Sequence, residues 1–285
     1  MSEVGIIGNG FVGGAVAHGF RDKHPLVYDI NPEVSPNTFE EAANCKYLFI
    51  CLPTPMVSET GGEANTSIVE DCLERLYQNK DQVIMLKSTV PIGTTKSLAK
   101  KYRLRNLIHC PEFLTAANAK YDFVNADRTV LGSPYYRDGI EEKYTKMAKE
   151  LFLETFPDIP VYTMKSCESE LVKYTANCFL ASKVGFFNMV FMLGEKLGLE
   201  YDRVLKGVLS DPRIGRSHTR VPGPDGDYGF GGTCFPKDVN AMIKTLNDHG
   251  ISSSILESVW QDNMSNRIRW DWAKNESAVK SNETR

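Results

Sequence analysis

Several patterns that would define a metal or disulfide site are missing from this sequence. No Cys-x-x-Cys pair occurs, and the five histidines form no His-x-His or His-Glu-x-x-His motif, which argues against a structural zinc site. The seven cysteines are odd in number and irregularly spaced, which disfavours a disulfide framework. We therefore expect a reduced, cytoplasmic protein that holds no metal.

Charge of one sign and long apolar runs are also scarce. The 33 basic and 36 acidic residues give a net charge of -3, which provides no basic excess for nucleic acid. No uninterrupted apolar run approaches the roughly 20 residues that span a bilayer. We therefore expect neither a nucleic-acid nor a membrane partner. The 42% hydrophobic and 24% charged residues are typical of a globular protein, and 285 residues suggest about two domains.

The first half of the chain alternates short apolar runs with amphipathic segments. The apolar runs predict seven strands, at residues 4–7, 26–28, 47–52, 83–86, 106–109, 129–131 and 161–162. The amphipathic segments predict helices, among them residues 12–20, 66–77, 94–101 and 138–152. Several runs are apolar throughout, as in parallel strands that helices cover on both faces. Residues 1–165 are therefore predicted to form an α/β domain with a doubly wound parallel sheet.

The pattern changes at Ser166, where a capping signal begins and the strand signals stop. The stretch Leu171–Leu197 contains no proline and predicts a long connecting helix of about 27 residues. Further helical patterns follow at residues 201–210, 236–249 and 252–272, so residues 166–285 are predicted to form an all-helical domain. The long helix carries more apolar side chains than one face needs, which predicts a homodimer packed through it. The Gly- and Pro-rich residues 211–232 are predicted to form a functional loop.

A glycine-rich turn follows the first predicted strand and opens a helix. Gly8, Gly10 and Gly13 form Gly-x-Gly-x-x-Gly, in which glycines allow a tight turn, the approach of a pyrophosphate and close helix–strand packing. Asp29 ends the next strand, 19 residues after Gly10, where an acidic residue binds both ribose hydroxyls and repels a 2′-phosphate. The alternative is an ordinary strand–helix turn. The context favours a Rossmann-type domain that binds NAD rather than NADP.

Cys234 lies in the segment Gly-Phe-Gly-Gly-Thr-Cys-Phe-Pro-Lys-Asp. The preceding glycines allow backbone or ligand to pack closely, and Pro236 can start a helix. A thiol beside a helix N-terminus, with Lys237 nearby, is placed to act as a nucleophile. The alternative is a buried, inert cysteine, which is our interpretation of most other cysteines in the chain.

Two further features are weaker when taken alone. Lys173 and Asn177 lie four residues apart on one face of the long helix, where they could hold a water or a substrate hydroxyl. On this feature alone, a solvated lysine at the helix surface is the preferred interpretation of Lys173. Glu112 follows a predicted strand at the carboxyl edge of the sheet, as a candidate base or as a helix-capping acid.

Taken together and in order, these motifs resemble the UDP-glucose/GDP-mannose dehydrogenase family of nucleotide-sugar dehydrogenases. The resemblance runs from Gly5 to about Asn266 and includes GNGFVG, CLPTP, GGEANTS, KSTVPIGT, PEFL, SELVKYTANCFLASK, DPRIG and GFGGTCFPKD. It implies oxidation of a sugar C6 alcohol to a carboxylate by two NAD-dependent hydride transfers, with UDP-glucose favoured as the substrate. It also implies that the long helix forms the core of a homodimer.

The resemblance also implies roles for individual residues. The implied catalytic residues are Cys234, Lys173, Asn177, Asp238, Glu112 and Thr89. The implied NAD-binding residues are Gly8, Gly10, Phe11, Val12, Gly13, Asp29, Pro53, Thr54, Thr89 and Lys237. The implied substrate-binding residues are Phe113, Leu114, Lys173, Asn177, Arg213, Phe230 and Gly231. Cys234 would carry a thiohemiacetal and then a thioester, Glu112 would act as a base, and Arg213 would reach the substrate of the neighbouring subunit.

Two departures from the family pattern leave alternatives open. Full-length members carry a third, C-terminal α/β domain that holds the nucleotide, and we expect this chain to lack it. Ala116 stands where members often have a second glutamate, four residues after Glu112. One alternative is a one-step β-hydroxyacid dehydrogenase, which shares the Rossmann domain, the long helix and the Lys-x-x-x-Asn pair but needs no thiol. The other is a truncated, non-catalytic NAD-binding dimer module.

Overall fold

The computed structural model describes residues 2–76, 81–137 and 142–279, and it divides the chain into two compact units. Unit 1 contains residues 1–54 and 66–173, and unit 2 contains residues 55–65 and 174–285. The sequence predicted a single boundary at residue 165. The contacts place it later, because the first turns of the long helix pack in unit 1, and they assign residues 55–65 to unit 2.

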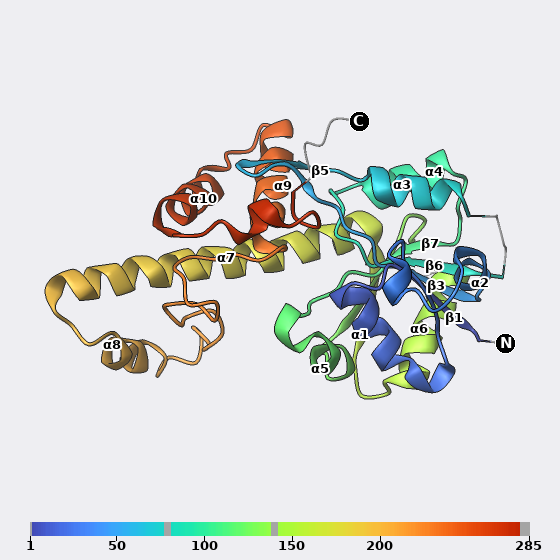
Figure 1. The fold of residues 1–285 in the computed structure, drawn as a ribbon, viewed down its shortest axis with the longest axis horizontal. Coiled ribbons are helices and arrows are strands. Elements are labelled where there is room, and N and C mark those ends of the chain that lie inside the picture. The colour runs from blue at the N-terminus through green and yellow to red at the C-terminus, as the bar shows by residue number, and fades with distance from the viewer. Residues whose placement is uncertain (1, 77–80, 138–141, 280–285) are drawn as a thin grey trace. The chain divides into compact units, whose positions relative to one another are not determined.

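Unit 1 is built on a seven-stranded sheet with the order β2-β1-β3-β6-β7-β8-β9. The strands are β1 (Val4–Ile7), β2 (Leu26–Tyr28), β3 (Tyr47–Ile50), β6 (Val83–Leu86), β7 (Leu107–His109), β8 (Thr129–Ser133) and β9 (Val161–Lys165). The helices are α1 (Phe11–Gly19), α2 (Phe39–Ala43), α3 (Ser67–Glu74), α4 (Thr94–Lys101), α5 (Ala119–Val124) and α6 (Lys143–Thr155). The predicted α/β class with a doubly wound sheet is confirmed (Figure 1).

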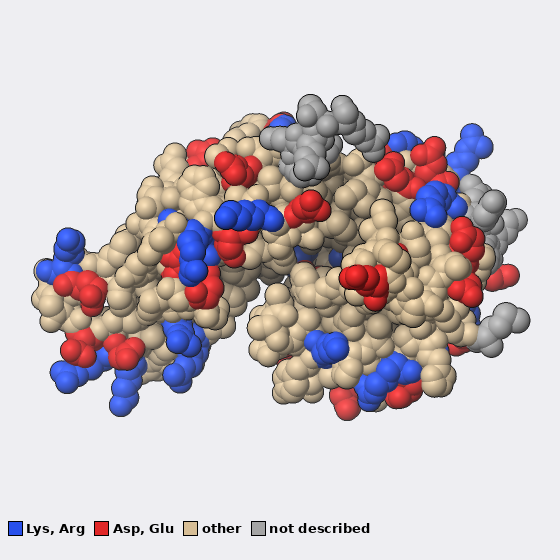
Figure 2. Space-filling model, viewed as in Figure 1, with Lys and Arg blue, Asp and Glu red and all other residues tan. Residues whose placement is uncertain are grey.

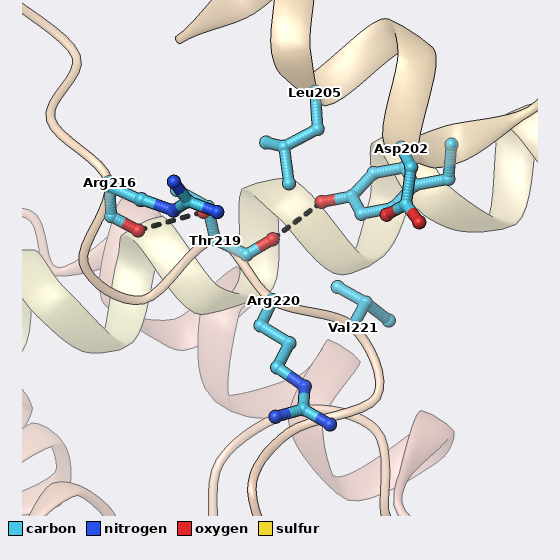
Figure 3. A pocket seen from close by; sticks show the side chains of 7 residues that line it. Asp202, Leu205, Arg216, Thr219, Arg220 and Val221 are labelled. Carbon is cyan, nitrogen blue, oxygen red and sulfur yellow. Dashed lines mark hydrogen bonds between the residues drawn. The ribbon is translucent and has the colours of Figure 1, made fainter.

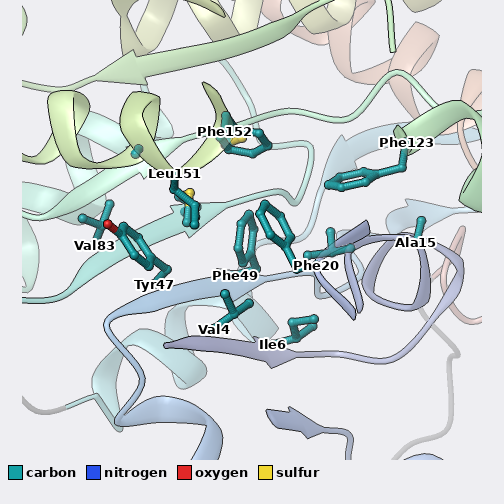
Figure 4. Close-up of a cluster of buried hydrophobic side chains, with 14 of the residues drawn as sticks. Val4, Ile6, Ala15, Phe20, Tyr47, Phe49, Val83, Phe123, Leu151 and Phe152 are labelled. Carbon is teal, nitrogen blue, oxygen red and sulfur yellow. The ribbon is translucent and has the colours of Figure 1, made fainter. Parts of the chain in front are cut away.

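Each face of this sheet has its own apolar core. Val4 and Ile6 of β1 pack with Phe20, Phe49 and Phe152 under α1, α5 and α6, and Figure 4 shows these side chains gathered on one face. The next residue of β1, Ile7, belongs to the opposite core, under α2, α3 and α4. This alternation follows from the two-residue period of a strand. Strands buried on both faces explain the continuous apolar runs in the sequence.

One strand of the sheet runs against the others. β8 pairs antiparallel with β7 and parallel with β9, so the expectation of an entirely parallel sheet was wrong at this position. The physical reason lies in the connection, because α5 packs against α1 without returning across the sheet. β8 therefore begins at the edge where β7 ends.

Unit 2 is mainly helical and includes most of the long helix. Its elements are α7 (Ser166–Leu197, whose first eight residues lie in unit 1), α8 (Tyr201–Val208), α9 (Phe235–Asp248), α10 (Ser254–Asn266) and a hairpin of β4 (Met56–Ser58) and β5 (Gly61–Ala64). The hairpin packs on α9, and in Figure 1 α9 and α10 lie on one side of α7 and α8 on the other. The core of unit 2 is rich in tryptophan, with Trp260 and Trp272 buried beside Phe230.

The predicted element limits hold best where the apolar pattern is strongest. Residues 94–101 form a helix with the expected bounds, whereas the long helix begins at Ser166, five residues before the prediction. The residues read as its cap form its first turn instead. Tyr77 and residues 138–141, predicted as helical, lie outside the described residues. The two strands of the hairpin and α2 were missed because each of these elements has five residues or fewer.

Candidate active site

The glycine-rich turn of unit 1 presents backbone groups at the start of α1. Gly8 has a φ of 93°, a left-handed value that suits glycine, and a Cβ at Gly13 would overlap the Gly8 carbonyl oxygen. Gly10 is the N-cap residue of α1 and provides no capping side chain, and the space where its Cβ would lie is open. The first amides of α1 therefore face a cradle that a pyrophosphate fits. Phe11 and Val12 lie in this first turn.

Asp29 follows β2 and lies directly beside this turn. Its carboxylate accepts hydrogen bonds from the backbone N–H of Asn9 at 2.6 Å and of Asn31 at 2.9 Å. The side chain thus holds the glycine turn and places an anionic group at the position predicted for ribose recognition. The donor set of the turn and this carboxylate fit NAD.

We expect Asp29→Ala to weaken NAD binding by about 1–3 kcal/mol, the range for losing charge-assisted hydrogen bonds. Isothermal titration with NAD and with NADP measures the effect. Asp22→Ala, which removes an exposed carboxylate elsewhere in unit 1, is the matched control and should leave both affinities unchanged. Tighter binding of NADP than of NAD by the unmodified protein would contradict the role given to Asp29.

Two loops at the carboxyl edge of the sheet in unit 1 are joined by hydrogen bonds. The Thr54 hydroxyl donates to the Thr89 carbonyl at 2.6 Å, and both side chains are buried. Ser88 donates to the Leu52 carbonyl and accepts from the Leu52 N–H. Pro53 lies between these contacts. The structure therefore brings together three of the residues predicted to contact NAD, namely Pro53, Thr54 and Thr89.

Glu112 and Lys173 form a buried ion pair in unit 1. The Lys173 ammonium donates to the Glu112 carboxylate and to the Glu112 carbonyl, both at 2.7 Å, and the two side chains are 2% and 5% exposed. Burial alone would raise the pKa of Glu112. The nearby Lys173 ammonium and the Leu114 N–H, which donates to the carboxylate at 2.7 Å, outweigh burial and hold the pKa below its ordinary value. Glu112 is therefore ionised at neutral pH, and Lys173 is not a solvated surface lysine.

Lys87 is a buried cation beside this pair that the sequence analysis did not single out. Its ammonium donates to the Pro111 carbonyl at 3.1 Å and contributes to the lowered pKa of Glu112. Burial raises the pKa of Cys51 to about 12, and the Lys87 charge opposes that shift. A lysine that directly follows an entirely apolar strand was the available signal. Such a residue lies at the carboxyl edge of a parallel sheet, where ligands bind.

A second polar group surrounds the start of α9 in unit 2. Asp238 accepts from the Lys237 ammonium at 2.5 Å and from the Asn177 side-chain amide at 2.6 Å, and all three residues are buried. Cys234 is the N-cap residue of α9, with its thiol partly exposed and 3.7 Å from the Thr233 hydroxyl. Cys178, by contrast, is buried, and its burial, together with the Asp238 charge, raises its pKa well above the ordinary value. Cys234 thus has the position expected of a nucleophile.

The predicted residues therefore fall into groups, each inside one unit. Unit 1 holds Glu112 with Lys173, and unit 2 holds Asp238 with Asn177 and Lys237. Within α7, Lys173 and Asn177 are four residues apart and share one side of the helix.

The predicted substrate-binding residues have varied surroundings. Phe113, in unit 1, has the Arg128 guanidinium 4.2 Å and the Lys173 ammonium 5.7 Å from its ring centroid. Leu114 is half-buried. Arg213 is exposed and pairs with Asp211. The Phe230 ring is buried in the core of unit 2, and Gly231 follows it in the loop that leads to Cys234.

A pocket in unit 2 lies apart from these residues. It has a volume of about 280 Å³ and is lined by Tyr201, Asp202, Leu205, Arg216, Thr219, Arg220 and Val221 (Figure 3). The Tyr201 hydroxyl donates to the carbonyl of Thr219, which also lines the pocket, at 2.7 Å. None of the predicted site residues lines this pocket.

Comparisons with known families and proteins agree with the motifs. Residues 29–154 match the NAD binding domain, and residues 167–265 the central domain, of the UDP-glucose/GDP-mannose dehydrogenase family. The UDP-glucose 6-dehydrogenase YwqF of Bacillus subtilis is 33% identical over 227 residues, which cover 76% of this chain and 48% of that protein. The chain thus spans about half the length of the curated relatives it matches. The predicted NAD-binding domain is confirmed.

Solved structures show the same fold. A UDP-glucose dehydrogenase from the hyperthermophilic archaeon Pyrobaculum islandicum superposes with a TM-score of 0.77 at 29% identity, over 93% of this chain and 68% of that one. A 3-hydroxyisobutyrate dehydrogenase of Mycobacterium tuberculosis superposes with a TM-score of 0.69 over 96% and 97%, but at 16% identity. The second likeness shows the fold alone, so the fold does not separate the two enzyme classes weighed from the sequence.

Proposed function

The chain belongs to the UDP-glucose/GDP-mannose dehydrogenase family, and we propose that it oxidises the C6 alcohol of a nucleotide sugar to a carboxylate. The favoured substrate is UDP-glucose, and the reaction consumes two NAD and one water. The observation that carries this proposal is Cys234, a partly exposed thiol at the N-cap of α9, next to the buried Lys237–Asp238 pair. A one-step alcohol oxidation needs no such thiol.

The cofactor residues of unit 1 define where NAD would be held. The first amides of α1 would bind its pyrophosphate, Asp29 its adenine-side ribose, and Thr54 and Thr89 would line the nicotinamide end. When bound, each NAD supplies a hydride acceptor, and two are needed for the four-electron oxidation.

The first oxidation requires a base and a cation near the substrate hydroxyl. The hydroxyl proton would pass to a water held by Asp238, Lys173 and Asn177 would stabilise the alkoxide at C6, and loss of one hydride gives the aldehyde. The Cys234 thiolate then forms a carbon–sulfur bond to the aldehyde carbon, and a proton is taken up by the oxygen. This thiohemiacetal presents a new carbinol, and loss of a second hydride and one proton gives a thioester.

Hydrolysis releases the acid and regenerates the thiol. Glu112 would accept a proton from the attacking water, and the carbon–sulfur bond breaks as the Cys234 thiolate leaves. The ion pair with Lys173 makes Glu112 a weak base in the resting protein, because it lowers the pKa of this carboxylate. Pairing of Lys173 with the substrate oxygen would remove this partner from Glu112 and make the carboxylate more basic. The pair thereby couples binding of the substrate oxygen to activation of the water.

Formation of NADH across a panel of UDP- and GDP-sugars, with the mass of the product, tests this proposal. We expect two NADH for each acid formed, with UDP-glucose the preferred substrate. One NADH for each aldehyde formed would place the protein in the one-step class. Binding of NAD without turnover of any sugar nucleotide would indicate the non-catalytic module.

We also propose that α7 forms a homodimer. Phe179, Phe186 and Leu193 are spaced by seven residues and are 66%, 55% and 59% exposed, and Leu197 continues the stripe. A stripe of this kind buries apolar area against a second helix.

α7 is also long and apolar enough to cross a membrane by length and composition alone, a test that core helices of soluble proteins pass as well. The seven free thiols support a cytoplasmic location.

We expect Phe186→Glu to weaken the dimer by at least about 100-fold, because a symmetric interface contains the substitution twice. Sedimentation velocity at micromolar concentration measures the shift from dimer to monomer. Ile255→Glu is the control, since Ile255 is an exposed apolar residue of α10 outside the stripe. A monomer in the unmodified protein, or its partition into lipid vesicles, would contradict the dimer.

A further inference from the structure

The backbone before Cys234 is held by side chains from a distant part of unit 2. Asn263, on α10, accepts a hydrogen bond from the Phe230 N–H at 2.7 Å and donates one to the Phe230 carbonyl at 3.0 Å. Its side-chain amide therefore satisfies both polar groups of one residue. Asn263 is 3% exposed, so water does not compete for these bonds.

Arg267, one turn further along, holds the residue at the start of this backbone segment. It donates to the Tyr228 carbonyl at 3.1 Å, and its guanidinium also pairs with Asp225 and Asp271. The Arg267 side chain is only 2% exposed, and each of its three nitrogens has an acceptor. A side chain that donates to several acceptors at once needs the planar guanidinium of an arginine, which carries five N–H donors.

Asp271 completes the arrangement near the nucleophile. One carboxylate oxygen accepts from the Gly232 N–H at 2.9 Å, and the other accepts from Arg267. On the other side of the loop, the buried Asn188 of α7 accepts from the Gly229 N–H at 3.0 Å. Backbone groups between residues 228 and 232 are thus fixed from two helices and from the segment after α10.

These contacts also explain two glycines of the loop. A Cβ at Gly229 would overlap the Asn263 side-chain oxygen, and a Cβ at Gly231 would overlap the Arg267 guanidinium and the Asp271 carboxylate. The sequence analysis left open whether these glycines admit a ligand or neighbouring protein atoms. At positions 229 and 231 the space is already filled by protein atoms.

We propose that Asn263, Arg267 and Asp271 are positioning residues that fix the backbone of residues 228–232 and so place the Cys234 thiol at the start of α9. We call these three residues the loop clamp. None of them needs to touch the substrate, because they act through the backbone that leads into Cys234. The catalytic consequence rests on the proposed function, whereas the placement of the thiol does not.

Two measurements test the placement without any turnover. In Asn263→Ala we expect the amides of residues 228–233 to exchange hydrogen at least tenfold faster. We also expect iodoacetamide to alkylate the partly exposed Cys234 at least fivefold faster, as read by peptide mass spectrometry. Asn266→Ala, on the same helix but outside the loop clamp, should leave both rates within twofold. Unchanged rates in a folded Asn263→Ala protein would overturn the proposal.

Milder variants keep the test informative if Asn263→Ala does not fold. Asp271→Ala removes a half-exposed side chain and should accelerate exchange at the Gly232 amide, and Asn263→Asp keeps the acceptor for the Phe230 N–H and should have an intermediate effect. If neither changes exchange or alkylation, the loop clamp does not position the thiol.

Where the enzyme turns over UDP-glucose, a second signature applies. We expect kcat for acid formation to fall at least tenfold in Asn263→Ala, with KM and NAD affinity unchanged. A thiol that reacts faster with a small reagent but slower in catalysis is misplaced rather than lost. A rise in KM together with a fall in kcat, at an unchanged alkylation rate, would instead indicate a substrate contact and contradict a positioning role. Absence of turnover in the unmodified protein would contradict the proposed function alone.

Discussion

Replacing Cys234 with serine is expected to abolish net formation of the sugar acid while NAD binding is retained. The thiol separates a four-electron oxidation from an alcohol–aldehyde interconversion, because the thiohemiacetal that it forms presents a second carbinol to a second NAD. A serine hydroxyl is the weaker nucleophile, so acid formation should fall by about 10³-fold or more, equivalent to about 4 kcal/mol of barrier. Product mass and the ratio of NADH to acid measure the effect.

A matched control separates the role of this thiol from a general effect of losing a cysteine. Cys167 is also partly exposed and lies in the first turn of α7, so Cys167→Ser should retain activity within twofold. Glu112→Gln should instead accumulate the covalent adduct on Cys234, visible as a mass increase of the intact protein. Undiminished acid formation by Cys234→Ala would refute the thioester mechanism and return the protein to the one-step class.

The fold of unit 1 was accessible from the sequence because its strands are buried on both faces. Val83–Leu86 is apolar at every position and fully buried, so hydrophobicity alone located it. The direction of β8 was not accessible in this way. Strand direction depends on where α5 packs, and no period in the sequence records that contact.

The candidate site was predictable only in part for the same reason. Cys234 and Asp238 share one motif, so local spacing placed them together at the start of α9. The ion pair of Glu112 and Lys173 joins residues 61 positions apart, and only the resemblance to a family placed both in the site. Asn263 has no motif at all, since its partner Phe230 lies 33 residues away. Chemistry carried by short motifs was therefore predicted, whereas the long-range contacts that orient it were not.

Breaking the buried Glu112–Lys173 ion pair is expected to cause a large loss of stability in unit 1. Lys173→Met leaves the Glu112 carboxylate buried without its main counter-charge, which should lower the free energy of unfolding by about 3–5 kcal/mol. Because its pKa lies below the ordinary value of 4.5, ionised Glu112 contributes stability at neutral pH that is lost as the pH falls below that value. The difference in the free energy of unfolding between the unmodified protein and Lys173→Met should therefore become smaller as the pH falls. Urea unfolding at pH 7 and at pH 4 measures both effects.

A double variant and a surface pair make this prediction specific. Glu112→Gln removes the charge but keeps an acceptor for the Leu114 N–H, so the double variant Glu112→Gln/Lys173→Met should be more stable than Lys173→Met by at least about 1 kcal/mol. Lys101 pairs with Glu70 at 2.6 Å, but its side chain is 58% exposed and solvent screens the pair, so Lys101→Met should leave the free energy of unfolding nearly unchanged. If Lys173→Met and Lys101→Met lowered the free energy of unfolding equally, burial would not strengthen the interaction between Glu112 and Lys173. The change in basicity that the proposed hydrolysis step requires would then have no source.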